Sequence, residues 1–196
     1  MGKKEIIVIG GSAGSIDVLL KVLPTLPVNF PLPIIVVVHR KDSRDELLEG
    51  LLKSRSKMAV KGAEDKMKLN NSTIYIAPAG YHLLIEQDHS FSLDISEKIN
   101  YSRPNIDVTF ASVVDVYKGK IIGILLTGAN DDGARGMKLI KDAGGYTVIQ
   151  SLESSMIDIM PEAAETLSKP DKFLSPSEIS EFLNGISDFK CQCSNK

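Results

Sequence analysis

Residues 5–15 read EIIVIGGSAGS, a run of aliphatic residues after Glu5 that ends in a loop of glycine, serine and alanine. Short apolar runs that do not alternate with polar residues are typical of strands buried on both faces of a parallel sheet. Four more runs of this kind follow along the chain. The sequence therefore predicts buried strands at Glu5–Ile9, Pro33–Val38, Ser72–Ala77, Lys120–Leu126 and Gly145–Ile149.

Segments with the apolar spacing of amphipathic helices separate these strands. They cover residues 16–23, 47–52, 108–116 and 134–143. Strands that alternate with helices in this way indicate an α/β fold. We expect a three-layer sandwich, in which a mainly parallel sheet is covered by helices on both faces.

The middle and the end of the chain depart from this alternation. Leu83–Gln87 and Phe91–Ile95 are linked by the polar residues 88–90, which predicts a short antiparallel hairpin. Residues 170–176 are expected to form a surface connection, followed by a last helix at Ser177–Ile186 with Ser177 as its N-cap. We expect one domain over residues 1–188 and a disordered tail over residues 189–196.

Composition and charge exclude several classes of protein. The 196 residues include 23 basic and 25 acidic side chains, so the basic surplus of a nucleic-acid-binding protein is missing. The longest uncharged apolar run, residues 31–38, is too short to cross a membrane, and glycines interrupt the first apolar run where a signal peptide would continue. Cys191 and Cys193 have poor spacing for a disulfide or a zinc site, and their role stays open. We expect a cytoplasmic enzyme or binding domain.

Polar residues follow three of the predicted strands at the points where those strands end. Ser12 stands in the glycine loop after the first strand, His39 directly follows the second, and Asp131 and Asp132 follow the fourth. Because the carboxyl ends of parallel strands meet at one edge of a sheet, a hydroxyl, an imidazole and a carboxylate are expected at the same edge. This is the set of groups that an acyl-transfer enzyme needs.

Each of these residues also has an interpretation without catalysis. Ser12 is suited to cap the following helix, His39 to pack at a strand end, and Asp131 or Asp132 to cap the helix that begins near Gly133. The glycine spacing after the first strand matches neither a dinucleotide-binding nor a phosphate-binding loop. The joint placement at three strand ends favours the catalytic interpretation.

Six segments together resemble the catalytic domain of the CheB family, the chemoreceptor glutamate methylesterases of bacterial chemotaxis. The resemblance runs from about Lys4 to Ile186 and rests on residues 10–14, 38–39, 76–78, 103–107, 126–133 and 160–163. Members of this family carry a Ser–His–Asp triad in that chain order, whereas ordinary α/β-hydrolases have the order Ser–Asp–His.

The resemblance implies a role for individual residues. Ser12 matches the nucleophile, His39 the base, Asp132 the orienting carboxylate, and the backbone N–H of Ala129 the oxyanion donor. Arg103 is a candidate for contact with the substrate. The implied reaction hydrolyses glutamyl methyl esters on the helical cytoplasmic part of a chemoreceptor, and also allows deamidation of receptor glutamines. It requires no metal and no organic cofactor.

Two positions depart from the family pattern. Ser15 replaces a glycine, and the glycine usual before Asn-Asp-Gly is displaced, so that residues 129–133 read ANDDG. The receiver domain that many members carry does not precede the first strand, so the chain is either a stand-alone esterase or a fragment. A separate receiver or methyltransferase is then a possible partner. A small-molecule carboxylesterase with the same triad and a non-catalytic receptor-binding module remain as alternatives.

Overall fold

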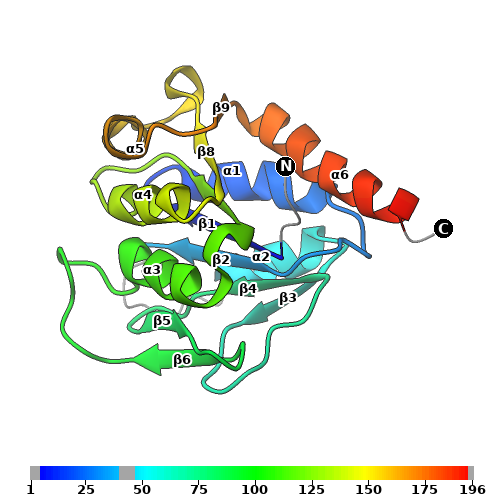
Figure 1. Cartoon of the computed structure of the whole chain (residues 1–196), viewed down its shortest axis with the longest axis horizontal. Coiled ribbons are helices and arrows are strands. Elements are labelled where there is room, and N and C mark those ends of the chain that lie inside the picture. The colour runs from blue at the N-terminus through cyan, green and yellow to red at the C-terminus, as the bar shows by residue number, and fades with distance from the viewer. Residues whose placement is uncertain (1–4, 40–46, 194–196) are drawn as a thin grey trace.

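The computed structural model describes residues 5–39 and 47–193 and contains one seven-stranded sheet (Figure 1). Its strands are β1 (Ile6–Gly11), β2 (Ile34–Val38), β3 (Ala59–Gly62), β4 (Thr73–Ile76), β7 (Ile121–Leu125), β8 (Tyr146–Gln150) and β9 (Lys172–Leu174). They lie in the order β3-β4-β2-β1-β7-β8-β9, and every neighbouring pair is parallel. The chain leaves β1 toward β2 and later returns to its other side through β7, so the strand order reverses at β1. Ligands of open parallel sheets bind at such a reversal.

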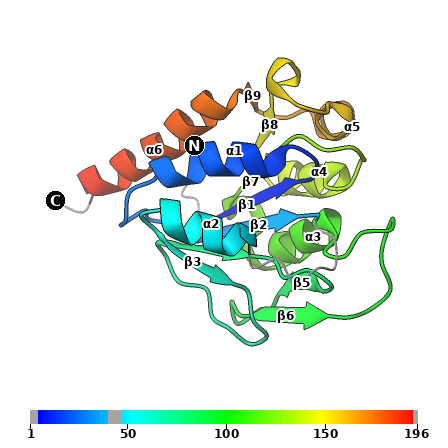
Figure 2. The ribbon, with the colours of Figure 1, turned by 180° about the vertical axis from the view of Figure 1, so that it is seen from behind.

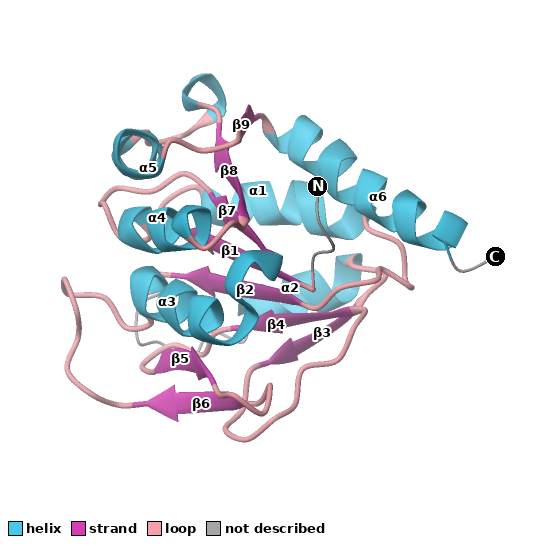
Figure 3. Cartoon of the chain, in the orientation of Figure 1, coloured by secondary structure: helices cyan, strands magenta, loops and turns pink. Residues whose placement is uncertain are grey.

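The predicted hairpin is confirmed. Strands β5 (His82–Ile85) and β6 (Phe91–Asp94) form a separate antiparallel pair, in which Leu83 lies opposite Leu93. Figure 3 shows this pair beneath the main sheet, beside one of its helices.

Helices cover both faces of the sheet, which confirms the predicted three-layer α/β sandwich (Figures 1 and 2). Helices α1 (Ser15–Val22), α2 (Leu47–Arg55) and α6 (Pro176–Cys193) lie on one face, and α3 (Ile106–Tyr117), α4 (Ala134–Asp142) and α5 (Ile159–Ser168) lie on the other. Three short 3-10 helices complete the described elements: η1 (Leu23–Thr25), η2 (Lys118–Lys120) and η3 (Leu152–Ser154). No helix in the described part of the chain is long and apolar enough to span a membrane.

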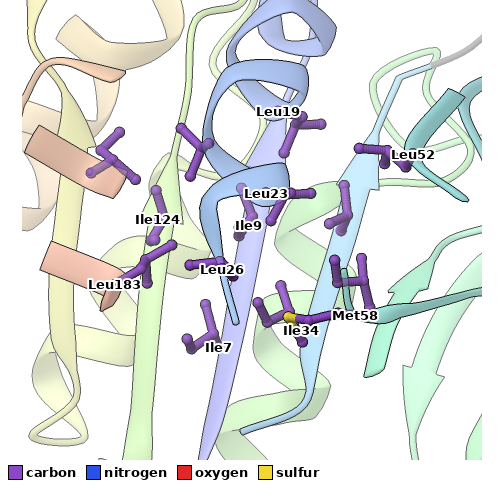
Figure 4. Packing of buried hydrophobic residues seen from close by; sticks show 14 of the residues in the cluster. Ile7, Ile9, Leu19, Leu23, Leu26, Ile34, Leu52, Met58, Ile124 and Leu183 are labelled. Carbon is purple, nitrogen blue, oxygen red and sulfur yellow. The ribbon is translucent and has the colours of Figure 1, made fainter. Parts of the chain in front are cut away.

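Alternate side chains of the central strands pack into two separate hydrophobic cores, one on each face of the sheet. Ile7 and Ile9 of β1 pack against Leu19 and Leu23 beneath α1 and η1 (Figure 4). Ile6 and Val8 point to the opposite face and join the core under α3, α4 and α5. Because each of these side chains is fully buried, each contributes about 1.5–3 kcal/mol to the stability of the folded protein. This double burial is the reason that the central strands read as unbroken apolar runs.

Two strands and one α-helix of the described chain were not predicted from the sequence. The edge strand β3 was not anticipated, β9 falls inside the expected surface connection 170–176, and helix α5 was recognised only as a motif of the family resemblance. An edge strand has one neighbour and less burial, so its sequence lacks the continuous apolar run of the central strands.

The last helix differs from its prediction at both ends. It begins at Pro176, and its first turn is closed by Ser175 and Glu178: the Ser175 N–H donates to Glu178 Oε2 at 2.8 Å, and the Glu178 N–H donates back to Ser175 Oγ at 3.4 Å. This capping box makes Ser175 the cap, and the prediction of Ser177 is wrong. The helix continues to Cys193, so residues 189–193, expected in a disordered tail, are helical. Residues 194–196 lie outside the described residues.

Candidate active site

The pairing of β1 with its two neighbours brings Ser12 and His39 to the same edge of the sheet. Gly11 pairs with Val38 of β2, and the His39 N–H then donates to the Gly11 carbonyl at 3.2 Å. On the other side, the Ser12 N–H donates to the Thr127 carbonyl at 3.0 Å. Ser12 therefore lies between the residues that follow β2 and β7, at the carboxyl edge of the sheet.

A tight turn of small residues carries Ser12 from β1 into α1. Gly14 has a φ of 82°, in the left-handed region, and is the N-cap of α1. A Cβ atom on Gly11 would lie 2.5 Å from Cβ of Ser15, so only glycine fits at Gly11. No side chain caps α1, and Ser12 Oγ makes no hydrogen bond to any described residue, so capping does not explain Ser12. Ser15 begins the helix and has no positive φ, so its replacement of the family's glycine strains no backbone. Its Oγ donates to the Ser12 carbonyl at 2.6 Å.

Asp132 and His39 form a hydrogen-bonded pair. His39 Nε2 lies 2.7 Å from Asp132 Oδ2, and Asp132 is only 1% exposed. The same carboxylate accepts the N–H groups of Ile106 at 2.8 Å and Asp107 at 2.9 Å, at the beginning of α3. Unpaired N–H groups and the helix dipole both favour a negative charge at this position. Three hydrogen bonds therefore hold the carboxylate of Asp132 in place.

The expectation that Asp131 or Asp132 caps the helix near Gly133 is wrong. The N-cap of α4 is Gly133, with a φ of 95° and no side-chain hydrogen bond. Asp132 instead satisfies the start of α3, and Asp131 is exposed.

Asp107 makes the reverse connection from α3 to α4. Its Oδ1 accepts the N–H of Gly136, in the first turn of α4, at 2.7 Å. Burial is the main cause that raises the pKa of Asp107 to about 6, and the nearby negative charge of Asp132 raises it further. Asp132 thus bonds the first N–H groups of α3, and Asp107 bonds an N–H in the first turn of α4, so the two helix starts are tied together around Asp132.

The contacts of the imidazole identify its basic nitrogen. A carboxylate only accepts hydrogen bonds, so Nε2 of neutral His39 carries the proton and donates it to Asp132. The lone pair is then on Nδ1, which faces Nδ2 of Asn130 at 3.4 Å. Asn130 Oδ1 in turn accepts the Asp132 N–H at 3.2 Å. No pattern in the sequence predicts this contact, because Asn130 stands out there only as part of a departure from the family pattern.

Thr127 and Gln150 hold the loop that faces Ser12. The buried Gln150 accepts the Thr127 N–H at 3.0 Å. Thr127 Oγ1 donates to the Ile157 carbonyl at 2.7 Å and accepts the Ile157 N–H at 2.9 Å. Gln150 stands at the carboxyl end of β8, and that position is the signal by which sequence analysis could have found it.

The backbone N–H groups of Ala13 and Ala129 are among those near Ser12 that have no acceptor within the described residues. Both residues are exposed at their loops. The loops approach closely, because a Cβ on Gly128 would lie 3.0 Å from Cβ of Ser12 and 2.6 Å from Cε of Met160. The N–H of Ser12 itself is already bonded to Thr127.

Arg103 is engaged in holding its own loop. Its Nη1 donates to the carbonyls of Ile95 at 2.8 Å and Ser96 at 2.7 Å, and so anchors that loop. A contact between Arg103 and substrate stays a prediction.

The other two histidines lie away from this site: His82 Nε2 bonds the Glu97 carbonyl, and the His89 ring packs on Tyr117. Within the described residues, no group of three His, Cys, Asp or Glu side chains could hold a metal ion.

A parallel α/β sheet that carries a serine, a histidine and a buried carboxylate at its carboxyl edge presents the groups that a serine hydrolase uses. The family follows from comparison: residues 7–183 match the model of the CheB methylesterase family, and this chain belongs to that family.

Relatives and a solved structure agree with this membership. A Leptospira interrogans protein named putative protein-glutamate methylesterase/protein-glutamine glutaminase is 44% identical over 177 residues, which are 90% of this chain and 92% of the relative. An Archaeoglobus fulgidus protein-glutamate methylesterase/protein-glutamine glutaminase is 38% identical over 83% of this chain, but over only 47% of its own length. The crystal structure of the Thermotoga maritima CheB methylesterase catalytic domain matches with a TM-score of 0.90 and 35% identity, over 94% of this chain and 99% of that domain.

Proposed function

We propose that this chain hydrolyses glutamyl methyl esters on the cytoplasmic helices of chemoreceptors and deamidates receptor glutamines, with Ser12, His39 and Asp132 as its catalytic triad. The observation that carries the proposal is the 2.7 Å pair of His39 Nε2 and buried Asp132 at the strand end beside Ser12. The names of the Leptospira and Archaeoglobus relatives support the same two reactions.

The first step is the attack of Ser12 Oγ on the carbonyl carbon of the ester or amide. A serine hydroxyl is a weak nucleophile at neutral pH, so a base must remove its proton during the attack. In the proposed mechanism Nδ1 of His39 takes that proton. Asp132 keeps the other proton on Nε2 and stabilises the imidazolium that forms.

The carbonyl oxygen becomes negatively charged in the tetrahedral intermediate. The N–H groups of Ala129 and Ala13 have no protein acceptor within the described chain and are the donors that we assign to this oxyanion. Each such donor contributes about 3 kcal/mol to catalysis.

The imidazolium then returns its proton to the leaving group. Methanol leaves from the ester, or ammonia from the amide, and an acyl-enzyme remains on Ser12. Water, deprotonated by His39, attacks this acyl-enzyme, and the glutamate side chain and the Ser12 hydroxyl are restored. Apart from the attacking water, the chain's own side chains and backbone supply every catalytic group in this series of steps.

The remaining assignments belong to the same proposal. The partner is the methylated cytoplasmic part of a chemoreceptor, which Arg103 helps to bind, and the enzyme acts in the cytoplasm. Residues 1–188 form its catalytic domain.

The test is release of methanol from a methylated receptor fragment. Ser12→Ala removes the nucleophile, and we expect a loss of activity of at least about 10³-fold with unchanged circular dichroism and melting temperature. Ser54→Ala, an exposed serine on α2, is the matched control and should retain full activity. Wild-type turnover by Ser12→Ala contradicts the triad. Turnover of short nitrophenyl esters without action on the methylated receptor contradicts the receptor substrate and favours a small-molecule carboxylesterase.

A further inference from the structure

We propose that Asn130 is a positioning residue that restrains His39, because its carboxamide occupies the ring nitrogen that must accept the proton of Ser12. This inference rests on the proposed function. Asn130 lies in the segment 129–133, in which the usual glycine of the family is displaced, and its Nδ2 lies 3.4 Å from His39 Nδ1.

The orientation of the Asn130 carboxamide follows from its other contact. Asn130 Oδ1 accepts the backbone N–H of Asp132 at 3.2 Å, so the oxygen is turned away from the ring. The NH₂ group is therefore the end that faces His39. Turns of this kind, in which an asparagine side chain bonds the backbone two residues later, hold the side chain in place. The φ of Asn130 is not positive, so no backbone strain opposes this conformation.

Two donors compete for one acceptor at this position. Neutral His39 donates from Nε2 to Asp132 and therefore has a single lone pair, on Nδ1. The Asn130 NH₂ group faces that lone pair, whereas Ser12 Oγ makes no hydrogen bond to the described residues. Ser12 must displace Asn130 before its proton can move to the ring.

The competition becomes stronger during the reaction. Once Nδ1 has accepted the proton it is itself a donor, and an NH₂ group that faces it cannot form a hydrogen bond. Asn130 thus favours the resting imidazole over the imidazolium, and we expect it to slow the attack by Ser12. A residue that merely supports the fold would have the opposite effect on the rate when it is replaced.

Two variants distinguish a residue that restrains His39 from one that only supports the fold. Asn130→Ser keeps a side-chain acceptor for the Asp132 N–H and removes the NH₂ group. Asn130→Asp keeps the size and that acceptor, but places a carboxylate oxygen beside Nδ1, which favours a proton there and removes the lone pair. Asn71→Ser, an exposed asparagine at the opposite end of the strands, is the matched control.

The measurement is the rate at which a fluorophosphonate probe labels Ser12. We expect roughly two- to tenfold faster labelling in Asn130→Ser, the range for loss of one modest hydrogen bond, and slower labelling in Asn130→Asp. Asn71→Ser should label at the wild-type rate. Slower or unchanged labelling of Asn130→Ser, at an unchanged melting temperature, overturns the proposal, because a supporting role would slow both variants.

Nitrogen NMR of histidine-labelled protein provides a readout that does not depend on catalysis. The His39 Nδ1 resonance, assigned by its loss in His39→Gln, should move in Asn130→Ser toward the position of a nitrogen without a hydrogen bond. If this resonance does not move, the contact does not restrain the ring and the proposal is wrong. If the probe fails to label Ser12 even in the wild type, the proposed function fails, and the Nδ1 resonance alone decides the role of Asn130.

Discussion

Replacing Asp132 by asparagine removes one charge from the site and changes little else in shape. The carboxylate accepts three hydrogen bonds, from His39 Nε2 and from the N–H groups of Ile106 and Asp107. A carboxamide has one accepting oxygen and a donating NH₂ group. It therefore cannot reproduce all three contacts in either orientation.

The two orientations of the new side chain fail in different ways. If its oxygen lies where Oδ2 was, His39 and Ile106 keep their acceptor, and the NH₂ group faces the N–H of Asp107. If its oxygen lies where Oδ1 was, the NH₂ group faces Ile106 and His39, and the imidazole changes tautomer so that Nδ1 carries the proton. Either way one helix N–H loses its partner and the imidazolium loses its counter-charge.

These losses set the expected magnitudes for Asp132→Asn. The rate of methanol release from methylated receptor should fall by about 10⁴-fold, the loss known for removal of the carboxylate from a Ser–His–Asp triad. The unpaired N–H at the start of α3 should lower the free energy of unfolding by about 1–3 kcal/mol. Both are measured on one preparation, by steady-state kinetics and by urea unfolding.

Asp131→Asn is the control for this experiment. Asp131 adjoins Asp132 in the chain, is exposed, and has no side-chain hydrogen bond to the described residues. The control should change neither rate nor stability. If Asp132→Asn keeps more than a tenth of the wild-type kcat/KM, the carboxylate neither sets the tautomer nor stabilises the imidazolium, and the assignment of the triad is refuted.

Two further predictions concern the junction of α3 and α4. Burial raises the pKa of Asp107 to about 6, so the folded protein binds a proton on this carboxyl more tightly than the unfolded chain does. The stability that this proton contributes is complete below pH 4 and is lost as the pH rises through 6. Asp107→Asn should therefore gain up to about 3 kcal/mol relative to the wild type between pH 4 and pH 7 in urea unfolding, and a difference that stays constant with pH would contradict this. Gly136→Ala places a Cβ atom 2.6 Å from Cβ of Phe110 and should cost about 1–3 kcal/mol. The same change at helical Gly50, which has no atom within 4 Å of the added Cβ, should stabilise by up to about 1 kcal/mol, and equal thermal shifts of the two variants would show that the contact with Phe110 is unimportant.

The central strands could be predicted because strands buried on both faces have continuous runs of aliphatic residues. β1 and β2 are covered on both faces, so every residue from Ile34 to Val38 is aliphatic and buried. The rule that strand ends meet at one edge then predicted that Ser12 and His39 would be neighbours, and the pairing of Gly11 with Val38 has that consequence.

The edge strands lack such a pattern. β3 alternates between exposed and buried residues over only four positions, and β9 has three residues of which two are exposed. Strands this short become recognisable only through the neighbour to which they bond. The error on Ser177 has a related cause, because Ser175 and Ser177 are both suitable caps and only the return bond from Glu178 selects Ser175.

The assignment of Asp132 shows where local reasoning about caps fails. An aspartate just before a helix is expected to cap that helix, since its carboxylate ordinarily reaches the first N–H groups. Here Gly133 intervenes with a φ of 95°, and its α-carbon packs so closely that a Cβ would lie 2.6 Å from Leu125 Cδ1 and 2.9 Å from Ile106 Cγ2. The glycine lets the chain turn against α3, so the carboxylate of Asp132 reaches Ile106 and His39 instead of its own helix. A side chain at position 133 would push α3 and α4 apart, and Asp132 would then lose its reach to Ile106. Asp132 and Gly133 therefore act together: the glycine allows the turn that brings the carboxylate to the imidazole.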